Sequence, residues 1–186
     1  IYSAEICLLY GNYPRALEHV RAQDRLLKSA MSLPKLVRFY IVAFLTLATH
    51  YPDMDTEQRT ETLERLERDL ARMTRWADNC EENFRHLQYL MEAELERLRG
   101  DHAAAVESYD AAIDAARESG FLRDEATACE RAARHLLSLG RRHSAEGYLR
   151  GAFRIYERWG AQRKLSLLKE EFPVLHELVG ASPGSA

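Results

Sequence analysis

The sequence predicts an all-α fold in which about nine helices pair as antiparallel hairpins and stack as an α-solenoid. Glycine (9) and proline (5) are few among the 186 residues and β-branched residues are scarce, which favours helices over sheets. The spacing Gly-x4-Ala-x3-large-x2-Ala-apolar occurs twice, forty residues apart, beginning at Gly100 and Gly140. One hairpin cannot bury its own apolar face, so a fixed period of this kind indicates stacked hairpins.

Small residues mark the places where helices of the repeat are expected to cross. Two alanines seven residues apart share one helix face and let a neighbouring helix approach, while the large residue between them fills the space between hairpins. Ala93 and Ala133 fall at the same forty-residue offset. The predicted repeat-packing residues are Ala93, Gly100, Ala105, Tyr109, Ala112, Ala133, Gly140, Ala145, Leu149 and Ala152.

The first three helices are delimited by turn residues. Residues 2–10 form an apolar helical segment, and residues 11–14 then supply glycine, asparagine and proline. Proline suits the first turn of a helix, so the second helix begins near Pro14 and runs to about Ala30. Pro34 starts a third helix, whose wide apolar face predicts the most buried element of the fold.

The fourth helix, residues 56–78, follows a loop over residues 51–55. Asp55 and Gln58 have the spacing of a capping box, which marks a helix start. The apolar residues of this helix are spaced three-four-three-four like a heptad seam. They are Leu63, Leu66, Leu70, Met73 and Ala77. A bundle helix with one narrow buried stripe explains this seam, and the other reading is a homodimer paired along it.

The second half of the chain is divided by glycines at intervals of twenty residues. Gly120 and Gly160 join Gly100 and Gly140, and glycine relieves the left-handed backbone with which many helices end. The expected helices are residues 83–99, 102–119, 121–139, 142–159 and 161–171, with a short helix starting at Pro173. Residues 1–179 are therefore expected to be one repeat domain from a longer protein, and residues 180–186 a linker or disordered tail.

Charge and composition argue against several partner classes. Residues 51–120 carry nine Lys/Arg against eighteen Asp/Glu, and such an acidic middle disfavours nucleic acid. The longest apolar run, residues 39–45, is too short to span a bilayer, so no membrane partner is expected. Cys7, Cys80 and Cys129 form no Cys-x-x-Cys pair and lie in helical patterns, which indicates reduced, buried thiols and a cytoplasmic location.

The sequence carries no recognisable catalytic, cofactor or metal signature. A phosphate-binding loop and a Gly-x-Gly-x-x-Gly turn are both missing, and none of the seven histidines follows a glutamate in Glu-x-x-His spacing. Residues 180–184 match Gly-x-Ser-x-Gly, but a nucleophile elbow needs a strand before it and a helix after it, and this match lies in the tail. No catalytic residue, cofactor or metal is therefore expected.

The hairpin formed by the expected helices at residues 83–99 and 102–119 resembles a tetratricopeptide repeat. The residues that carry this resemblance are Tyr89 and Ala93 on the first helix, Gly100 and Asp101 at the turn, and Ala105, Tyr109 and Ala112 on the second helix. The period here is forty residues rather than the tetratricopeptide period of about 34, so each helix is longer by most of a turn. The resemblance implies a tetratricopeptide-like domain.

Longer strings resemble a segment of very large bacterial and fungal signalling proteins. They are residues 76–84, residues 93–95 with 97, and residues 109–113, 145–149 and 156–161. In that family a serine/threonine-kinase-like domain and an AAA-type ATPase precede the helical repeats, and a GAF domain and often a sensor histidine kinase follow them. This resemblance implies a scaffold or relay between an ATPase and its output modules, with protein partners.

One set of charged residues is a candidate interaction site. In tetratricopeptide arrays the first helix of each hairpin lines a concave groove, and Glu94, Arg97, Glu130 and Arg134 would project toward it. Charged groups in a groove can hold the termini or side chains of a peptide. Glu130 and Arg134 are also four residues apart and can pair with each other.

The leading hypothesis is therefore a non-catalytic repeat module that mediates protein–protein or interdomain contacts. The alternative is a ligand-sensing module that takes a small molecule or peptide in the groove.

Overall fold

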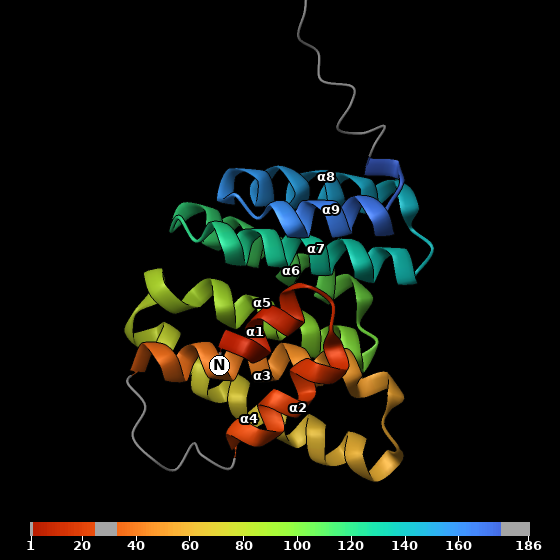
Figure 1. The fold of residues 1–186 in the computed structure, drawn as a ribbon. Helices are drawn as coiled ribbons and strands as arrows, with labels where there is room; N and C mark the ends of the chain where they lie inside the picture. Colours follow the sequence, from red (N-terminus) through yellow and green to blue (C-terminus); the bar gives the residue numbers. More distant parts are fainter. Residues whose placement is uncertain (1, 25–32, 176–186) are drawn as a thin grey trace, which may run out of the picture. The chain divides into compact units, whose positions relative to one another are not determined.

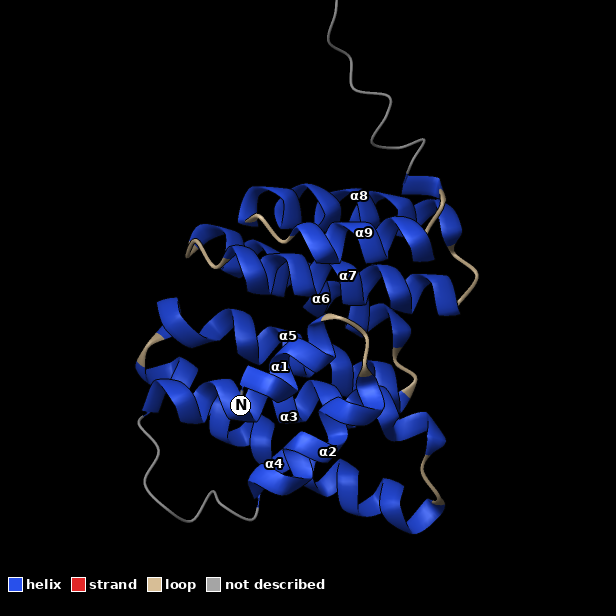
Figure 2. Cartoon of the chain, viewed as in Figure 1, coloured by secondary structure: helices blue, strands red, loops and turns tan. Residues whose placement is uncertain are grey.

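The computed structural model describes residues 2–24 and 33–175, and these residues are helical apart from short connections (Figure 1). Figure 2 shows helices and loops and no strand in this described part, so the all-α prediction is confirmed. The elements are α1 (Tyr2–Leu9), α2 (Tyr13–Asp24), α3 (Leu33–His50), the 3-10 helix η1 (Tyr51–Asp53), α4 (Thr56–Asn79), α5 (Glu81–Arg99), α6 (His102–Glu118), α7 (Leu122–Ser138), α8 (Arg142–Trp159) and α9 (Gln162–Glu171).

The chain divides into two compact units. Unit 1 is Ile1–Ala105 and unit 2 is Val106–Ala186, so the boundary falls inside α6. The expectation of one repeat domain over residues 1–179 therefore stays a prediction.

The core of unit 1 is built around α3. From Phe39 to Thr49 this helix carries no charged residue, and Phe39 and Phe44 are buried. A helix that is apolar on a wide face needs neighbours on several sides. Accordingly α3 packs against α1, α2, α4 and α5.

The start of α4 follows the capping-box prediction. The Asp55 side chain accepts a hydrogen bond from the Gln58 backbone N–H at 2.9 Å, and the Gln58 side chain accepts one from the Asp55 N–H at 3.4 Å. The expected loop before it contains one short turn of 3-10 helix, η1, whose second residue is Pro52. Proline is favourable there because backbone N–H groups in the first turn of a helix have no partner within it, so the N–H that proline lacks is not missed.

The apolar seam of α4 faces its own unit. Leu66, Met73 and Ala77 are fully buried, and α4 packs along α5. Leu63 and Leu70 lie at the margin of this stripe, and both are partly exposed. These positions match a bundle helix with one narrow buried stripe, and pairing of two copies stays a prediction.

Glycine ends several helices with the same hydrogen-bond pattern. Gly100 has φ 82°, its N–H donates to the Arg97 carbonyl at 3.2 Å, and the Asp101 N–H donates to the Glu96 carbonyl at 3.0 Å. This is the Schellman motif, which requires a left-handed residue. The same pair of bonds recurs at Gly11, Gly120, Gly140 and Gly160.

The predicted repeat-packing residues other than the two glycines are buried. Ala93 and Ala105 are buried in unit 1. In unit 2 the buried members are Tyr109, Ala112, Ala133, Ala145, Leu149 and Ala152. α7 packs extensively on α8, which is the close approach that alanines permit.

Several expected features differ in detail or fall outside the described residues. Helix α5 begins at Glu81 rather than 83, because Cys80 alone separates it from α4. Of the three cysteines only Cys129 is buried, while Cys7 and Cys80 are partly exposed. The predicted end of the second helix near residue 30, most of the helix from Pro173 and the tail at 180–186 lie outside the described ranges.

Candidate functional site

In unit 1 the predicted groove residues Glu94 and Arg97 form an ion pair on α5. The Arg97 Nη2 atom donates to the Glu94 carboxylate at 2.8 Å and also to the Ala48 carbonyl at 3.0 Å. Ala48 is in the last turn of α3, where carbonyl groups have no partner within the helix. The hydrogen bond to Ala48 ties α5 to the end of α3. Glu94 itself is only 1% exposed, so its charge is neutralised by Arg97 away from solvent.

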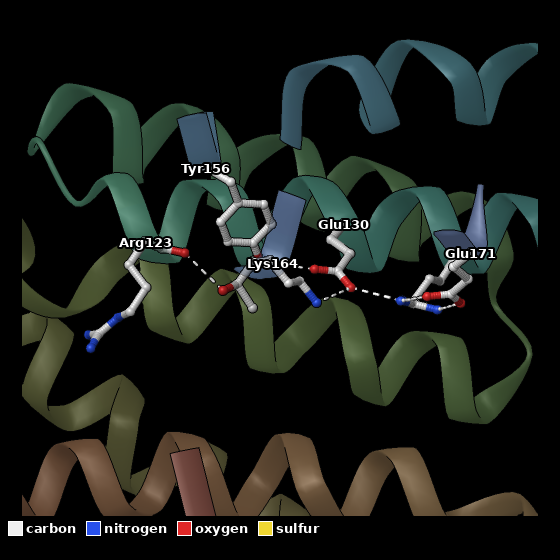
Figure 3. Close-up of polar contacts among 7 residues, drawn as sticks. Arg123, Glu130, Tyr156, Lys164 and Glu171 are labelled. Carbon is white, nitrogen blue, oxygen red and sulfur yellow. Dashed lines mark hydrogen bonds and ion pairs between the residues drawn. The ribbon is translucent and has the colours of Figure 1, made fainter. Parts of the chain in front are cut away.

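In unit 2 the predicted groove residues Glu130 and Arg134 belong to a larger polar cluster. Figure 3 shows the Glu130 carboxylate on α7 surrounded by side chains from α8 and α9. We call Glu130, Arg134, Tyr156, Lys164 and Glu171 the α7–α9 cluster. The pairing of Glu130 with Arg134 that the sequence leaves open is present, with Nε and Nη2 of the arginine 3.0 and 2.9 Å from the same carboxylate oxygen.

Both oxygens of the Glu130 carboxylate accept hydrogen bonds. Lys164 Nζ donates to Oε1 at 2.8 Å, and the Tyr156 hydroxyl donates to Oε2 at 2.9 Å. Glu130, Lys164 and Tyr156 are all buried. A buried charge is tolerated when it is paired and hydrogen-bonded, and this carboxylate meets both conditions.

The surroundings of Glu130 shift the pKa of two groups in opposite directions. Burial alone would raise the pKa of Glu130, but the charges of Lys164 and Arg134 and their hydrogen bonds outweigh it and leave that pKa below its ordinary value. Burial, followed by the negative charge of Glu130, raises the pKa of Tyr156 well above its ordinary value. Glu130 is therefore charged at neutral pH, and the tyrosine keeps the proton that it donates.

The outer end of the α7–α9 cluster is closer to solvent. Arg134 Nη2 also donates to Glu171 Oε2 on α9 at 2.7 Å, and its guanidinium lies 5.3 Å from the centre of the Phe172 ring. Exposed ion pairs contribute little stability. The contacts of Arg134 with Glu130, with Glu171 and with the Phe172 ring nevertheless fix the direction of its side chain.

A comparison with protein-family models matches residues 18–177 of the chain to the family described as CHK1-like, TPR repeats. The chain belongs to the CHK1-like TPR repeat family. Neither the curated proteins nor the solved structures gave a significant match. The tetratricopeptide resemblance seen in the sequence is thereby confirmed, and TPR arrays are protein-interaction modules.

Within this TPR repeat chain the four predicted groove residues form two pairs, one in each unit. Glu94 with Arg97 lies in unit 1, and Glu130 with Arg134 lies in unit 2. Both glutamates are buried and paired within their own unit. A shared groove for a partner therefore stays a prediction.

Three members of the α7–α9 cluster are not predicted by the sequence, namely Tyr156, Lys164 and Glu171. One signal was available for Lys164, because Leu168 follows it by four residues and a lysine on the apolar face of a short helix needs a buried partner. The identity of that partner depends on how α9 packs, which helix periodicity does not specify.

Unit 1 also contains a pocket of about 580 Å³ that the TPR family match does not explain. Its apolar lining includes Val20, Leu47 and Met54. Its charged lining consists of Arg21, Asp24, Glu61, Glu64, Arg65 and Arg68. The volume suits a small ligand or a peptide side chain, and the balanced charges disfavour a polyanion.

A carboxylate pair shares one arginine beside this pocket. Arg65 donates to both oxygens of Asp24 at 2.6 and 2.8 Å, joining α4 to α2. Asp69 is buried one turn further along α4, and its Oδ2 atom lies 3.6 Å from Arg65 Nε without a hydrogen bond. Burial, only partly offset by Arg65, raises the pKa of Asp69 to about 6.

The part of the chain that the structure describes offers neither a metal cluster nor a membrane-spanning helix. Within residues 2–24 and 33–175, no three His, Cys, Asp or Glu side chains are placed to hold a metal ion. No helix in the same ranges has the length and apolar character needed to cross a membrane.

Proposed function

We propose that this chain is a non-catalytic repeat module of a multidomain signal-transduction ATPase or kinase, acting in the cytoplasm through protein–protein or interdomain contacts. The TPR repeat family carries this proposal, because such repeats present helix faces to partners. The strings that resemble large signalling proteins support the parent architecture.

Exposed apolar side chains support contacts of this kind. On α1 of unit 1, Tyr2 and Ile6 are 71% and 53% exposed and lie one turn apart on the same face. The single charged residue of α1, Glu5, is paired with Arg38 at 2.6 Å. An uncharged apolar surface is typical of a face that meets another protein.

Crosslinking tests the proposal directly. The chain is mixed with the separately expressed kinase-like and ATPase domains, and crosslinks are mapped by mass spectrometry. We expect crosslinks along the helices and a weaker complex for Ile6→Glu, whereas Thr60→Glu at an exposed position of α4 serves as the control. A chain that forms no complex with either domain would contradict the proposal.

The pocket in unit 1 favours ligand sensing as the second candidate function. A ligand that binds only the folded chain raises the free energy of unfolding by RT ln(1 + [L]/Kd), about 2.7 kcal/mol at a hundred times Kd. Thermal shifts with small peptides and metabolites should therefore find a stabilising compound. Met54→Trp, which fills the apolar lining, should abolish that shift, and a screen without any stabilising compound would leave only the contact role.

A further inference from the structure

Helix α9 is attached to the rest of unit 2 differently from α8. The buried residues of α8 are all uncharged, and they are Ala145, Leu149, Ala152, Phe153, Ile155 and Tyr156. The buried residues of α9 are Lys164, Leu165 and Leu168, so one of three is a charged side chain. The packing of α9 on α8 is also much less extensive than that of α7 on α8.

Two charged contacts fix α9 against α7. Lys164 and Glu171 are seven residues apart, which places them on the same face two turns from each other. Lys164 meets Glu130 at 2.8 Å, and Glu171 meets Arg134 at 2.7 Å. Glu130 and Arg134 lie one turn apart on α7, so the two contacts together set the register of α9.

The geometry points to α9 as a releasable latch, which opens while α7 and α8 stay packed and thereby uncovers Glu130 and Arg134. Segments with few buried apolar contacts open at lower free energy than the core. A buried ion pair is weak evidence of stability, because the cost of desolvating its two charges can cancel their attraction. Both statements describe α9, whereas the α7–α8 contact is apolar and extensive.

The groups left behind favour this opening. When Lys164 leaves, Glu130 still accepts hydrogen bonds from Arg134 on its own helix and from Tyr156 on α8. The carboxylate is therefore not left as an unpaired buried charge, and water can replace the ammonium group. Gly160, with φ 80°, forms the connection between α8 and α9 and provides a pivot point.

Amide hydrogen exchange of the full chain, followed by mass spectrometry, tests the latch. We expect peptides from α9 to exchange about tenfold or more faster than peptides from α8 in the unaltered chain. Lys164→Met should accelerate exchange in α9 by about another tenfold and leave α7 and α8 within about twofold. Arg163→Met, at the exposed neighbouring position, is the matched control and should change none of the three helices.

Two results would overturn this inference. One is equal exchange of α9 and α8 in the unaltered chain, which needs no variant and so remains decisive if Lys164→Met does not fold. The other is acceleration of α7, α8 and α9 together by Lys164→Met, because that pattern would make Lys164 an ordinary core residue of unit 2. Neither outcome depends on the proposed signalling role.

Discussion

Single residues in this chain differ in how well their charges are satisfied. Glu130 accepts hydrogen bonds from three side chains, whereas Asp69 faces one arginine at 3.6 Å. The pKa directions follow this difference, since the pKa of Glu130 is lowered and that of Asp69 is raised to about 6. Burial of the charged Asp69 carboxylate therefore lowers the stability of the fold. At Glu130 the favourable interactions with Lys164 and Arg134 outweigh the cost of burial.

Asp69→Asn should stabilise the protein at neutral pH. Because the folded pKa of Asp69 is the higher one, the folded state binds the extra proton between pH 3.8 and about 6, and the free energy of unfolding falls as pH rises through that window. The substitution removes this loss, which is worth roughly 1–3 kcal/mol at pH 7.5. Urea unfolding at pH 4 and pH 7.5 measures it.

The exposed Asp78→Asn on the same helix is the control for this effect, and it should not stabilise the protein at pH 7.5. A variant at Asp69 that is less stable than the unaltered chain at pH 7.5 would contradict the prediction.

Tyr156→Phe should destabilise unit 2 because it removes a hydrogen bond to a buried carboxylate. We expect a loss of roughly 1.5–3 kcal/mol in the free energy of urea unfolding. The pKa of Glu130 should rise in the variant, so acid unfolding should begin at a higher pH. Tyr148→Phe removes a partly exposed hydroxyl that donates to Asp110, and as the control it should cost far less.

At the scale of elements, the helix ends were the most predictable feature. Gly100, Gly120, Gly140 and Gly160 were expected at helix ends from their spacing, and all four have positive φ. The Asp55–Gln58 cap was also predictable, because both residues act on backbone groups within one turn. Local chemistry of this kind depends only on residues that are neighbours in the sequence.

Two glycines of unit 2 should respond oppositely to alanine. Gly140 has φ 72°, which an alanine adopts only with strain, so Gly140→Ala should lower the free energy of unfolding by about 1 kcal/mol. Gly147 lies inside α8 with open space around it, so Gly147→Ala should raise the free energy of unfolding by about 0.5–1 kcal/mol. Thermal unfolding of the two variants measures both changes, and equal signs would contradict this account.

The candidate site was only partly predictable. The Glu130–Arg134 pair could be foreseen because it lies within one helix, and its link to Lys164 could not because the two residues are 34 positions apart. The partner of a buried charge is selected by packing between helices. Periodicity gives the face of a helix but not which helix will cover it.

At the scale of the whole molecule, self-association of two copies through the apolar seam of α4 can be tested with two substitutions. Leu66 is fully buried, so Leu66→Asp should unfold unit 1 at a cost of several kcal/mol whether or not copies pair. Leu63 is partly exposed, and Leu63→Asp should leave the fold intact.

Sedimentation of the unaltered chain and of Leu63→Asp decides whether the seam also pairs two copies. If it does, the unaltered chain sediments as a dimer and Leu63→Asp as a monomer. A monomer in both cases would rule out a homodimer paired along this seam, and circular dichroism verifies that the variant is folded.

Because every glycine-ended helix closes with the same pair of backbone bonds, the chain departs from each of them with the same local geometry. Duplicating or deleting one forty-residue stretch between two such glycines would leave the backbone direction at the start of the next helix unchanged. Gene rearrangements could therefore lengthen or shorten this protein by whole periods without a new junction having to evolve.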